Sequence, residues 1–400
     1  MTEIYSIDKS LRTKTPALQS DSQQRRRRWQ WILKGAVVLL GLPYGLALAA
    51  ATYKVESIAP LGSTTSIADN INNFGVAIGL AHYAGDPATH AFIFDNGQST
   101  DLGTLGGRDA VAYGINDQNQ VVGVSSTLYG NQHAFLYSNG TIADLGNILS
   151  AGGNSTAYAI NNAAQIVGPS DTDSKVSPHA FLKDGNSVTD LGSFGGQSIA
   201  YDINNFGQVV GTSYTALNAN SYAYLYTNGT MINLGTLGGS SSSAGGLNDL
   251  GQVVGRSNIA GDSASHAFVF ANGMMSDLGT LGGASSSAGD INSSGQIVGI
   301  ADSATATNLP FIYNGGVIQN INDLIDPASG WYITDLERLN DVGQITGRGC
   351  QAGVCGAIVL TPNDPLPAQV PEPAPYALML AGLVLMSTAY RIQRPPAETL

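Results

Sequence analysis

Four of the five histidines recur in one repeated His-Ala-Phe block, as His90, His133, His179 and His266. Imidazole side chains can bind metals and transfer protons. Equivalent positions on separate repeats lie far apart, however, and form one metal site only if all of them face a common centre. The same position also holds Tyr222 and Leu309, which a ligand role would not allow. We therefore expect a structural role for the histidines and no metal site.

Acidic and amide side chains recur at two further positions. An Asp-Leu-Gly block contains Asp101, Asp144, Asp190 and Asp277, and a turn rich in Asn, Asp and Gly follows each Ile-Asn pair. Glycoside hydrolysis needs two carboxylates about 5–9.5 Å apart, which one Asp per repeat does not provide. The turns lack the spaced oxygen ligands of an EF-hand, and Asn and Asp stabilise turns without metal. We predict turn and rim roles, with a weak cation site at the turns as the alternative.

The two cysteines, Cys350 and Cys355, lie five residues apart in the segment CQAGVC. A close, even pair in an exported protein indicates a disulfide. The spacing is not that of a CxxC redox motif, and no histidine lies nearby to complete a metal site. We predict a structural disulfide between them.

Binding residues are sought where the repeat is interrupted. His82, Tyr83 and Asp86 occupy a loop of the first repeat, and Tyr214 occupies the same loop of the fourth. The last repeat carries an insertion around Trp331 and Tyr332. Exposed Trp and Tyr suit stacking on sugar rings or contact with a protein, so we predict that these six residues bind a ligand. The alternative for Trp331 is a filling role at the seam of the fold.

Charge and motif content narrow the function classes. The net charge is −12, and residues 51–368 carry 24 acidic and seven basic side chains. Such a body repels phosphate backbones, so we expect no nucleic-acid binding. No GxSxG, HExxH, Walker or Rossmann motif occurs in the required context, so we expect no cofactor and no enzyme. The alternative is a glycan hydrolase or lyase whose non-repeated carboxylates converge within about 10 Å.

A repeat of about 44 residues organises the chain from residue 53 to residue 361. Blocks related to INDQNQVVG begin at Ile71, Ile115, Ile160, Ile203, Leu247, Ile291 and Leu339. Each unit has four short strand patterns, and Asn-Gly pairs at four hairpins supply the positive φ angles of a two-residue turn. A Gly/Ser-rich link such as TLGGSSSSA, residues 236–244, is expected between units. Four antiparallel strands per unit predict an all-β, seven-bladed β-propeller, with a parallel solenoid as the second choice.

The strand count also predicts how the ring closes. Seven first, second and third strands follow in order, but only six fourth strands follow a third strand. The missing fourth strand is the N-terminal segment Tyr53 to Ile58. We expect this segment to pair with residues 356–360 in the last blade, so that the ring has no free edge at its seam.

The repeated blocks resemble the extracellular HAF-repeat family, which is named for the His-Ala-Phe block. The resemblance covers roughly residues 55–360, with five clear copies and two degraded ones. It implies an extracellular location and carries over no catalytic activity.

Residues 1–50 are typical of a secretory signal. Arg25 to Arg28 precede an apolar stretch from Trp29 to Leu48, and Ala47-Leu48-Ala49 fits a signal peptidase site. The alternative is an uncleaved membrane anchor. In either case the basic end stays in the cytoplasm and the body is exported.

The C-terminal segment carries a second signal. Val370-Pro371-Glu372-Pro373 precedes an apolar run from Tyr376 to Tyr390, which Arg391 and Arg394 follow. These residues resemble the PEP-CTERM sorting signal of Gram-negative bacteria. The resemblance implies a linker at 362–370, an apolar helix within 371–400 and removal of the tail by an exosortase-type membrane protease. A plain single-span tail anchor is the alternative.

Together these patterns predict an exported, monomeric repeat protein of the cell surface or extracellular matrix, transiently held in the membrane by its C-terminal helix. We expect a non-catalytic binding or structural module, linked to exopolysaccharide or to an envelope protein. Signal peptidase and the exosortase-type protease are the expected processing partners.

Overall fold

The computed structural model describes residues 52–58, 62–63, 65–83, 85–150, 153–172 and 177–363. The N-terminal signal and the sorting motif (Val370, Pro371, Glu372, Pro373, Arg391 and Arg394) lie outside the described residues, as does the apolar helix expected near the C-terminus. Within the described residues, no helix is long and apolar enough to cross a bilayer.

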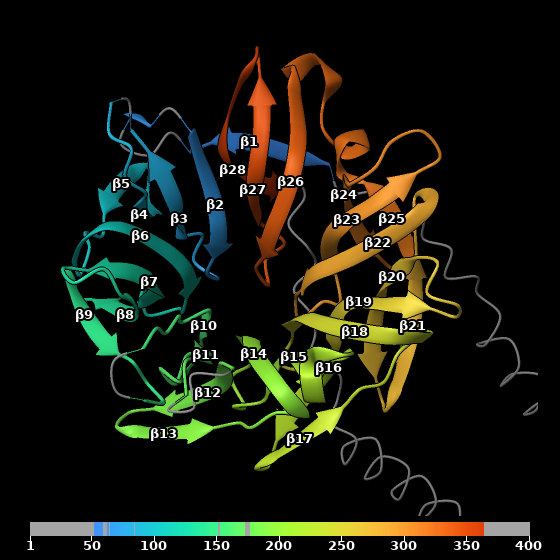
Figure 1. Cartoon of the computed structure of the whole chain (residues 1–400). Helices are drawn as coiled ribbons and strands as arrows, with labels where there is room; N and C mark the ends of the chain where they lie inside the picture. Colours follow the sequence, from blue (N-terminus) through green and yellow to red (C-terminus); the bar gives the residue numbers. More distant parts are fainter. Residues whose placement is uncertain are drawn as a thin grey trace, which may run out of the picture. The chain divides into compact units, whose positions relative to one another are not determined.

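Seven four-stranded antiparallel sheets are arranged as the blades of a β-propeller, which confirms the predicted fold class (Figure 1). Blades one and two contain β2 (Thr65–Ile71), β3 (Ala77–His82), β4 (His90–Asp95) and β5 (Gln98–Asp101), then β6 (Gly106–Ile115), β7 (Val121–Thr127), β8 (Gln132–Ser138) and β9 (Thr141–Gly146). Blades three and four contain β10 (Ala159–Ile160), β11 (Ile166–Ser170), β12 (His179–Asp184) and β13 (Ser187–Asp190), then β14 (Gly195–Ile203), β15 (Val209–Thr215), β16 (Ser221–Thr227) and β17 (Thr230–Asn233).

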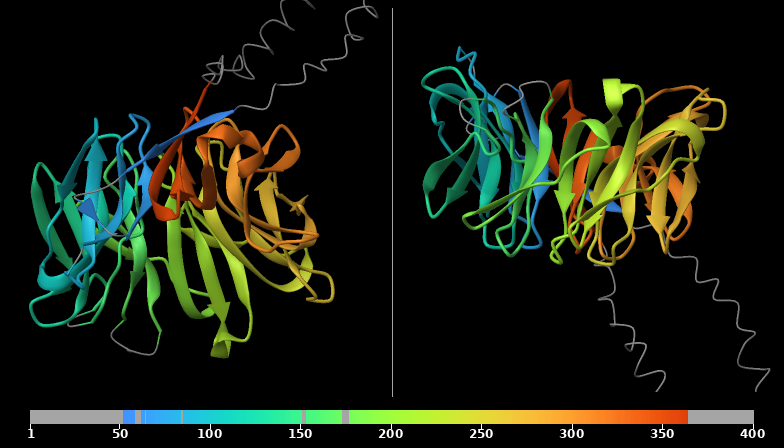
Figure 2. Two further views of the ribbon diagram at one scale, coloured as in Figure 1. Left: turned by 90° about the horizontal axis from the view of Figure 1, so that it is seen from above. Right: turned by 60° about the horizontal axis from the view of Figure 1, so that its bottom comes forward.

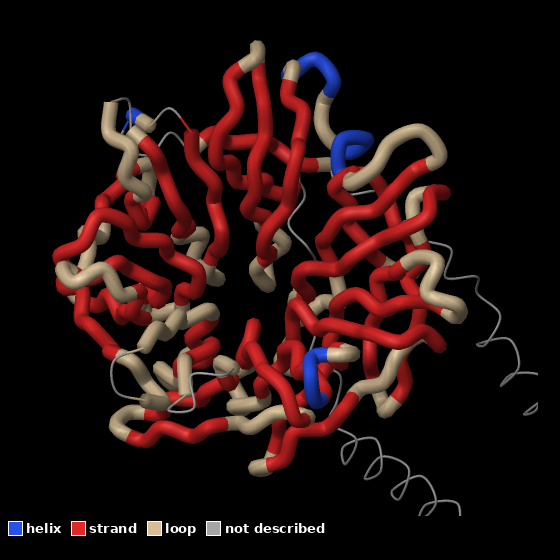
Figure 3. The backbone as a smooth tube through the Cα atoms, viewed as in Figure 1, coloured by secondary structure: helices blue, strands red, loops and turns tan. Residues whose placement is uncertain are grey.

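Blades five and six contain β18 (Gly238–Leu247), β19 (Val253–Ile259), β20 (Ser265–Ala271) and β21 (Met274–Gly279), then β22 (Gly282–Ile291), β23 (Ile297–Ser303), β24 (Leu309–Asn314) and β25 (Val317–Asn320). The last blade contains β26 (Trp331–Leu339), β27 (Ile345–Gln351), β28 (Val354–Pro362) and β1 (Tyr53–Ser57). Short 3₁₀ turns occur at Ala216–Asn218, Ile321–Leu324 and Pro327–Ser329. The first strand of each blade lies innermost, and the strands pass between the two faces of the ring (Figures 2 and 3).

The N-terminal strand closes the ring as predicted. β1 pairs antiparallel with β28, with Tyr53 opposite Pro362 and Ser57 opposite Ile358. The Ile58 amide extends the pairing by donating to the Ala357 carbonyl at 2.9 Å. This strand is the fourth strand of the last blade, so residues 53–58 pair with residues 357–362 and close the ring.

A ring of seven buried asparagines joins the blades at one end of the axis. These are the repeated Ile-Asn and Leu-Asn asparagines: Asn72, Asn116, Asn161, Asn204, Asn248, Asn292 and Asn340. Each Nδ2 donates to the backbone carbonyl of the asparagine in the next blade, at 2.9–3.2 Å. The last of these bonds, from Asn340 to Asn72, spans 268 residues and completes the circle. We call these residues the Asn ring.

The hydrophobic core lies between blades rather than within them. The largest fully buried side chain of each third strand is an aromatic residue in six blades: Phe92, Phe135, Phe181, Tyr224, Phe268 and Phe311. Phe135, for example, belongs to the same cluster as Ala110 and Ala112 of its own inner strand and Ala91 of the first blade. Packing large residues beside small ones lets neighbouring sheets approach closely.

One repeated glycine is required by this close packing. At Gly211 an added Cβ would overlap the carbonyl oxygen of Ile199 on the neighbouring strand. The equivalent position is glycine in all seven blades: Gly79, Gly123, Gly168, Gly211, Gly255, Gly299 and Gly347. The glycine is therefore repeated because the first and second strands lie too close together at this position for any side chain.

The Gly/Ser-rich segments are not links between blades, which corrects the interpretation of the sequence. Residues 238–247 form β18, the innermost strand of the fifth blade, and 282–291 form β22. Their serines bind the preceding blade. Ser242 Oγ accepts a hydrogen bond from the Ala223 amide at 3.0 Å and donates to the Gly235 carbonyl at 2.6 Å. Small polar residues thus replace the apolar pattern that normally marks a strand.

We predict that Asn204→Ala destabilises the fold by about 2–4 kcal/mol, because it removes four hydrogen bonds of a buried amide. Asn204 donates to Asn248 and Gln208 and accepts from the amides of Phe206 and Gln208. Urea unfolding measures the loss. Asn205→Ala, one residue further on and exposed to solvent, is the control and should cost under about 1 kcal/mol. Equal losses of unfolding free energy in both variants would show that the Asn ring contributes no more to stability than the exposed residue beside it.

Candidate functional site

The repeated histidines and aspartates lie on the outer strands and bind one another. His90 Nδ1 lies 2.8 Å from Asp101 Oδ2, and the pairs at 133/144, 179/190 and 266/277 lie 2.7–3.0 Å apart. In the fourth blade both partners change together, to Tyr222 and Asn233. The carboxylates also accept the amide of the glycine two residues later, as in Asp144 with Gly146 at 2.7 Å. These contacts fit the structural role that the repeat predicts.

Three of the predicted binding residues form a local network in the first blade. His82 ends β3, and its Nδ1 lies 3.3 Å from the Ala88 carbonyl. The Tyr83 ring packs against His90 at 4.5 Å, and burial, with smaller effects of nearby carboxylates, raises the Tyr83 pKa to about 12. Asp86 accepts from the Ala88 amide and lies 3.2 Å from His90 Nε2, and these bonds lower its pKa. The contacts of these three residues are thus with one another's neighbours in the same segment of the first blade.

The other predicted binding residues do not join this loop. Tyr214 is on β15, in the fourth blade, and lines a cavity described below. Trp331 begins β26 and packs against the core of the last blade, beside Ile58 and Cys355. Tyr332 is 52% exposed. The position of Trp331 matches the seam-filling alternative, and the six residues do not form one site.

Cys350 and Cys355 are joined by a disulfide, as predicted. They stand opposite each other in the hairpin between β27 and β28. A disulfide in this position suits an extracytoplasmic protein.

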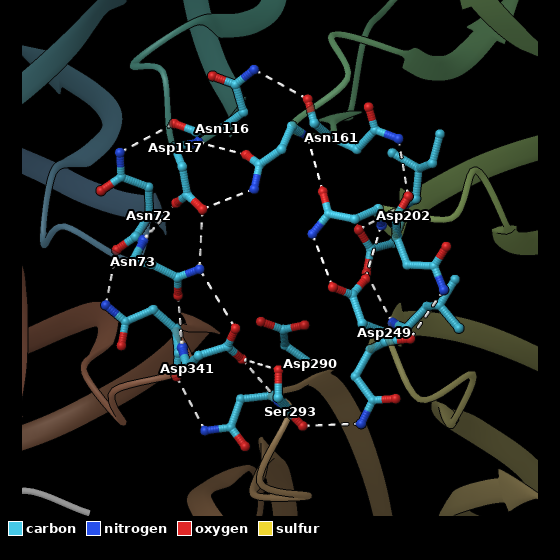
Figure 4. Close-up of a pocket in the computed structure, with 18 of the residues that line it drawn as sticks. Asn72, Asn73, Asn116, Asp117, Asn161, Asp202, Asp249, Asp290, Ser293 and Asp341 are labelled. Carbon is cyan, nitrogen blue, oxygen red and sulfur yellow. Dashed lines mark hydrogen bonds between the residues drawn. The ribbon is translucent and has the colours of Figure 1, made fainter. Parts of the chain in front are cut away.

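The axis of the ring, rather than its loops, gathers the polar side chains of all seven blades. The residues that follow the Asn ring form an outer rim around a cavity of about 170 Å³: Asn73, Asp117, Asn162, Asn205, Asp249, Ser293 and Asp341 (Figure 4). At most junctions a rim oxygen accepts the backbone amide of the neighbouring blade, as Asp249 accepts that of Asn205 at 2.8 Å. The acidic and amide side chains of the turns therefore form hydrogen bonds between neighbouring blades.

Three charged side chains lie deeper on the axis, two residues before the Asn ring. Arg338 Nη1 lies 3.5 Å from Asp290 Oδ1, and Asp290 Oδ2 accepts the Leu339 amide at 2.9 Å. Asp202 accepts the Leu247 amide at 2.9 Å. Burial raises the pKa of Asp202 to about 7; the charge of Arg338 opposes the rise and that of Asp290 adds to it. One guanidinium is thus shared between two carboxylates.

The next level, three residues before the Asn ring, holds Tyr in three neighbouring blades, Gly in two, and Asp and Glu in the remaining two. Tyr113, Tyr158 and Tyr201 form a chain of ring contacts at 5.2 and 5.7 Å. Asp69 and Glu337 stand in the two adjacent blades at the seam. Burial raises the pKa of both carboxyls, and the charge of Glu337 raises that of Asp69 further. Asp69 Oδ2 is buried without a hydrogen-bond partner.

Glycine occupies this level in blades five and six and leaves space beside the axis. A cavity of about 290 Å³ borders Gly245 and Gly289, with Tyr201, Arg256, Glu337 and Arg338 around it. An adjoining cavity of about 260 Å³ shares Tyr201 and Arg256 and extends to Tyr214. Its other lining residues are mainly hydroxylated: Thr212, Ser221, Ser241, Ser242, Ser243, Asn258 and Ser265. We call these two spaces the axial cavities.

Sequence reasoning missed most of this region. Of the six predicted binding residues, only Tyr214 lines an axial cavity. One signal in the sequence could have indicated this region. The asparagine of the Asn ring is the same in all seven repeats, whereas the residue three positions before it is Asp, Tyr, Gly or Glu. Within the described ranges, no group of three or more His, Cys, Asp or Glu side chains is arranged to hold a metal ion.

Comparison with known proteins supports the fold and no closer relationship. No family model matches the chain, and no curated protein matches it. Among solved structures, a puromycin hydrolase is 10% identical over 78% of this chain and 56% of its own, with a TM-score of 0.51. The β-propeller domain of the Trilobed protease from Pyrococcus furiosus is 10% identical over 65% of this chain and 84% of its own, with a TM-score of 0.46. A Trypanosoma rangeli sialidase is 11% identical over 84% and 60%, with a TM-score of 0.40.

The similarity to the puromycin hydrolase overturns the expectation that the chain is not an enzyme. That expectation rested on missing motifs, and the puromycin hydrolase shows that a chain of similar architecture belongs to an enzyme. At such low identity the similarity is one of fold, and a fold by itself does not decide whether a chain catalyses a reaction.

We predict that Asp202 makes the stability of the fold depend on pH. A carboxyl whose pKa is raised from the usual 3.8 to about 7 in the folded state stabilises the fold below pH ~4, and that contribution disappears as the pH rises through 7. The melting temperature of the wild type minus that of Asp202→Asn should therefore fall by several degrees between pH 4 and pH 8. Thermal unfolding of both proteins across this range measures it, and a difference that is flat or rising would contradict it.

Proposed function

We propose that the chain is an exported protein of the cell surface or extracellular matrix that binds polysaccharide in its axial cavities. The observation that carries the proposal is the larger axial cavity, which lies beside Gly245 and Gly289 on one side of the axis. Tyr201 lines both axial cavities, and Tyr214 lines the smaller one among side chains that carry hydroxyl groups. Aromatic rings with a few directed polar groups are what sugar rings require.

Export is supported by the chain's own features. The disulfide between Cys350 and Cys355 suits an oxidising compartment, and the sequence of residues 1–50 has the order of a secretory signal. Within this proposal, signal peptidase removes the N-terminal segment. An exosortase-type protease processes the tail after Pro371-Glu372-Pro373, and a Gram-negative envelope is the setting.

Polysaccharide cleavage is a second candidate, and it has its own observation. Asp69 and Glu337 are non-repeated carboxyls in adjacent blades, and burial raises the pKa of both. A carboxyl whose pKa is raised by burial can act as a general acid. Glu337 also borders the larger axial cavity. In this case a bound polymer would be shortened, and Glu337→Gln would abolish the shortening.

We predict that Tyr201→Ala weakens polysaccharide binding about tenfold, because truncating a central aromatic contact commonly costs more than 1 kcal/mol. Binding is measured by calorimetry against a panel of neutral and acidic polysaccharides, and the chain length of each polymer is followed in parallel. Tyr129→Ala is the matched control, because Tyr129 is 91% exposed and lies outside the axial cavities. Absence of binding across the panel, or equal binding by both variants, would contradict the proposal.

The processing part of the proposal predicts two cut ends. Mass spectrometry of the protein isolated from its native host should find one terminus near Ala50 and the other near Val370. An intact N-terminal segment would instead support the membrane-anchor alternative. An intact tail would contradict processing by an exosortase-type protease.

A further inference from the structure

Arg256 occupies an unusual place in the fifth blade. It lies on β19, at a position where five of the other blades have Leu80, Val124, Pro169, Thr212 and Ile300 and the last blade has Arg348. Its side chain borders both axial cavities. Ser243 stands opposite it on β18, and Ser287, Ala288 and Gly289 of the next blade border the same space. Small residues on both sides therefore leave the guanidinium open to a ligand.

The charge of Arg256 is not neutralised by the protein. Among the described lysines and arginines, only Arg338 forms an ion pair, with Asp290, so an unpaired charge alone does not distinguish Arg256. Its position does: of the described residues that line the smaller axial cavity, Arg256 alone carries a charge. It lines that cavity together with Tyr201 and Tyr214.

The neighbouring groups suit a sugar ring that carries the matching charge. Tyr201 and Arg256 line both axial cavities, and Tyr214 lines the smaller cavity with them. Ser241, Ser265 and Asn258 line the wall around them. Arginine recognises a carboxylate through two parallel hydrogen bonds in a planar fork, and hydroxyl and amide groups can bind the remaining sugar hydroxyls.

Resting on the proposed polysaccharide binding, we infer that the axial cavities select an acidic sugar, with Arg256 binding the carboxylate of a uronic acid residue. Tyr201 and Tyr214 contact the sugar ring, and the serines bind its hydroxyl groups. Arg256 is thus the specificity-determining residue of this site.

The test compares three polymers: polygalacturonate, its carboxyl-reduced neutral form, and dextran sulfate. Calorimetry with the full-length protein should show that the wild type binds polygalacturonate at least about tenfold more tightly than the reduced polymer, the range expected for a hydrogen-bonded charge. Arg256→Gln should remove that preference and leave binding of the reduced polymer unchanged. Arg256→Lys should retain part of the preference, because it keeps the charge and loses the fork.

Arg108→Gln is the matched control, since Arg108 is exposed on β6 of the second blade and its removal changes the net charge equally.

Equal binding of polygalacturonate and its reduced form by the wild type overturns the inference and leaves the proposed function standing. Tighter binding of dextran sulfate than of polygalacturonate also overturns it, because the site would then read sulfate. Failure to bind any of the three polymers, or any member of the earlier panel, refutes the proposed function itself. Comparing the polymers on the wild type keeps the inference testable even if Arg256→Gln does not fold.

Discussion

The closed circle of asparagine amides is the constraint on which the rest of the structure depends. Each amide nitrogen binds the next blade, while the oxygen closes the turn of its own blade, as Asn161 does with the amides of Ala163 and Gln165. A buried amide of this kind is costly unless all its hydrogen bonds are made. Aspartate would lack the donor, and glutamine would place it one bond too far. The bond from one blade to the next therefore needs asparagine at this position in every repeat.

Two further contacts recur around the circle, one within blades and one between them. Within four blades, near the outside, the histidine of the third strand binds the aspartate of the fourth strand. Between blades, a serine of the inner strand binds the third strand of the preceding blade, and Ser66 makes this contact to Ala357 across the seam. Because the blades are joined by these contacts, the residues three positions before the Asn ring can differ from blade to blade. Four of them, Tyr201, Gly245, Gly289 and Glu337, line the larger axial cavity.

The sequence was sufficient to predict the number of blades, the four strands in each and the closing role of the N-terminal strand. Hairpin turns could be located because Asn96-Gly97 and its equivalents need positive φ angles, which the structure shows. The first halves of the inner strands of blades five and six could not be recognised, because Gly and Ser give neither a strand pattern nor an apolar face. The residues of the axial cavities are hard to find in the sequence for a related reason. Interruptions of the repeat point to loops, whereas Tyr201, Gly245 and Glu337 vary inside strands, at a fixed distance from the Asn ring.

The repeats differ in length, but the hydrogen bonds of the Asn ring do not change with that length. The steps between Asn ring members range from 43 to 48 residues, yet the seven bonds between them stay within 2.9–3.2 Å. The longest step, from Asn292 to Asn340, contains the 3₁₀ turns at Ile321–Leu324 and Pro327–Ser329, which precede the inner strand β26. Additional residues are therefore accommodated before the strand begins, away from the Asn ring. An insertion there can change the rim of the fold without changing the distance between blades, whereas a change within an inner strand alters the axial cavities directly.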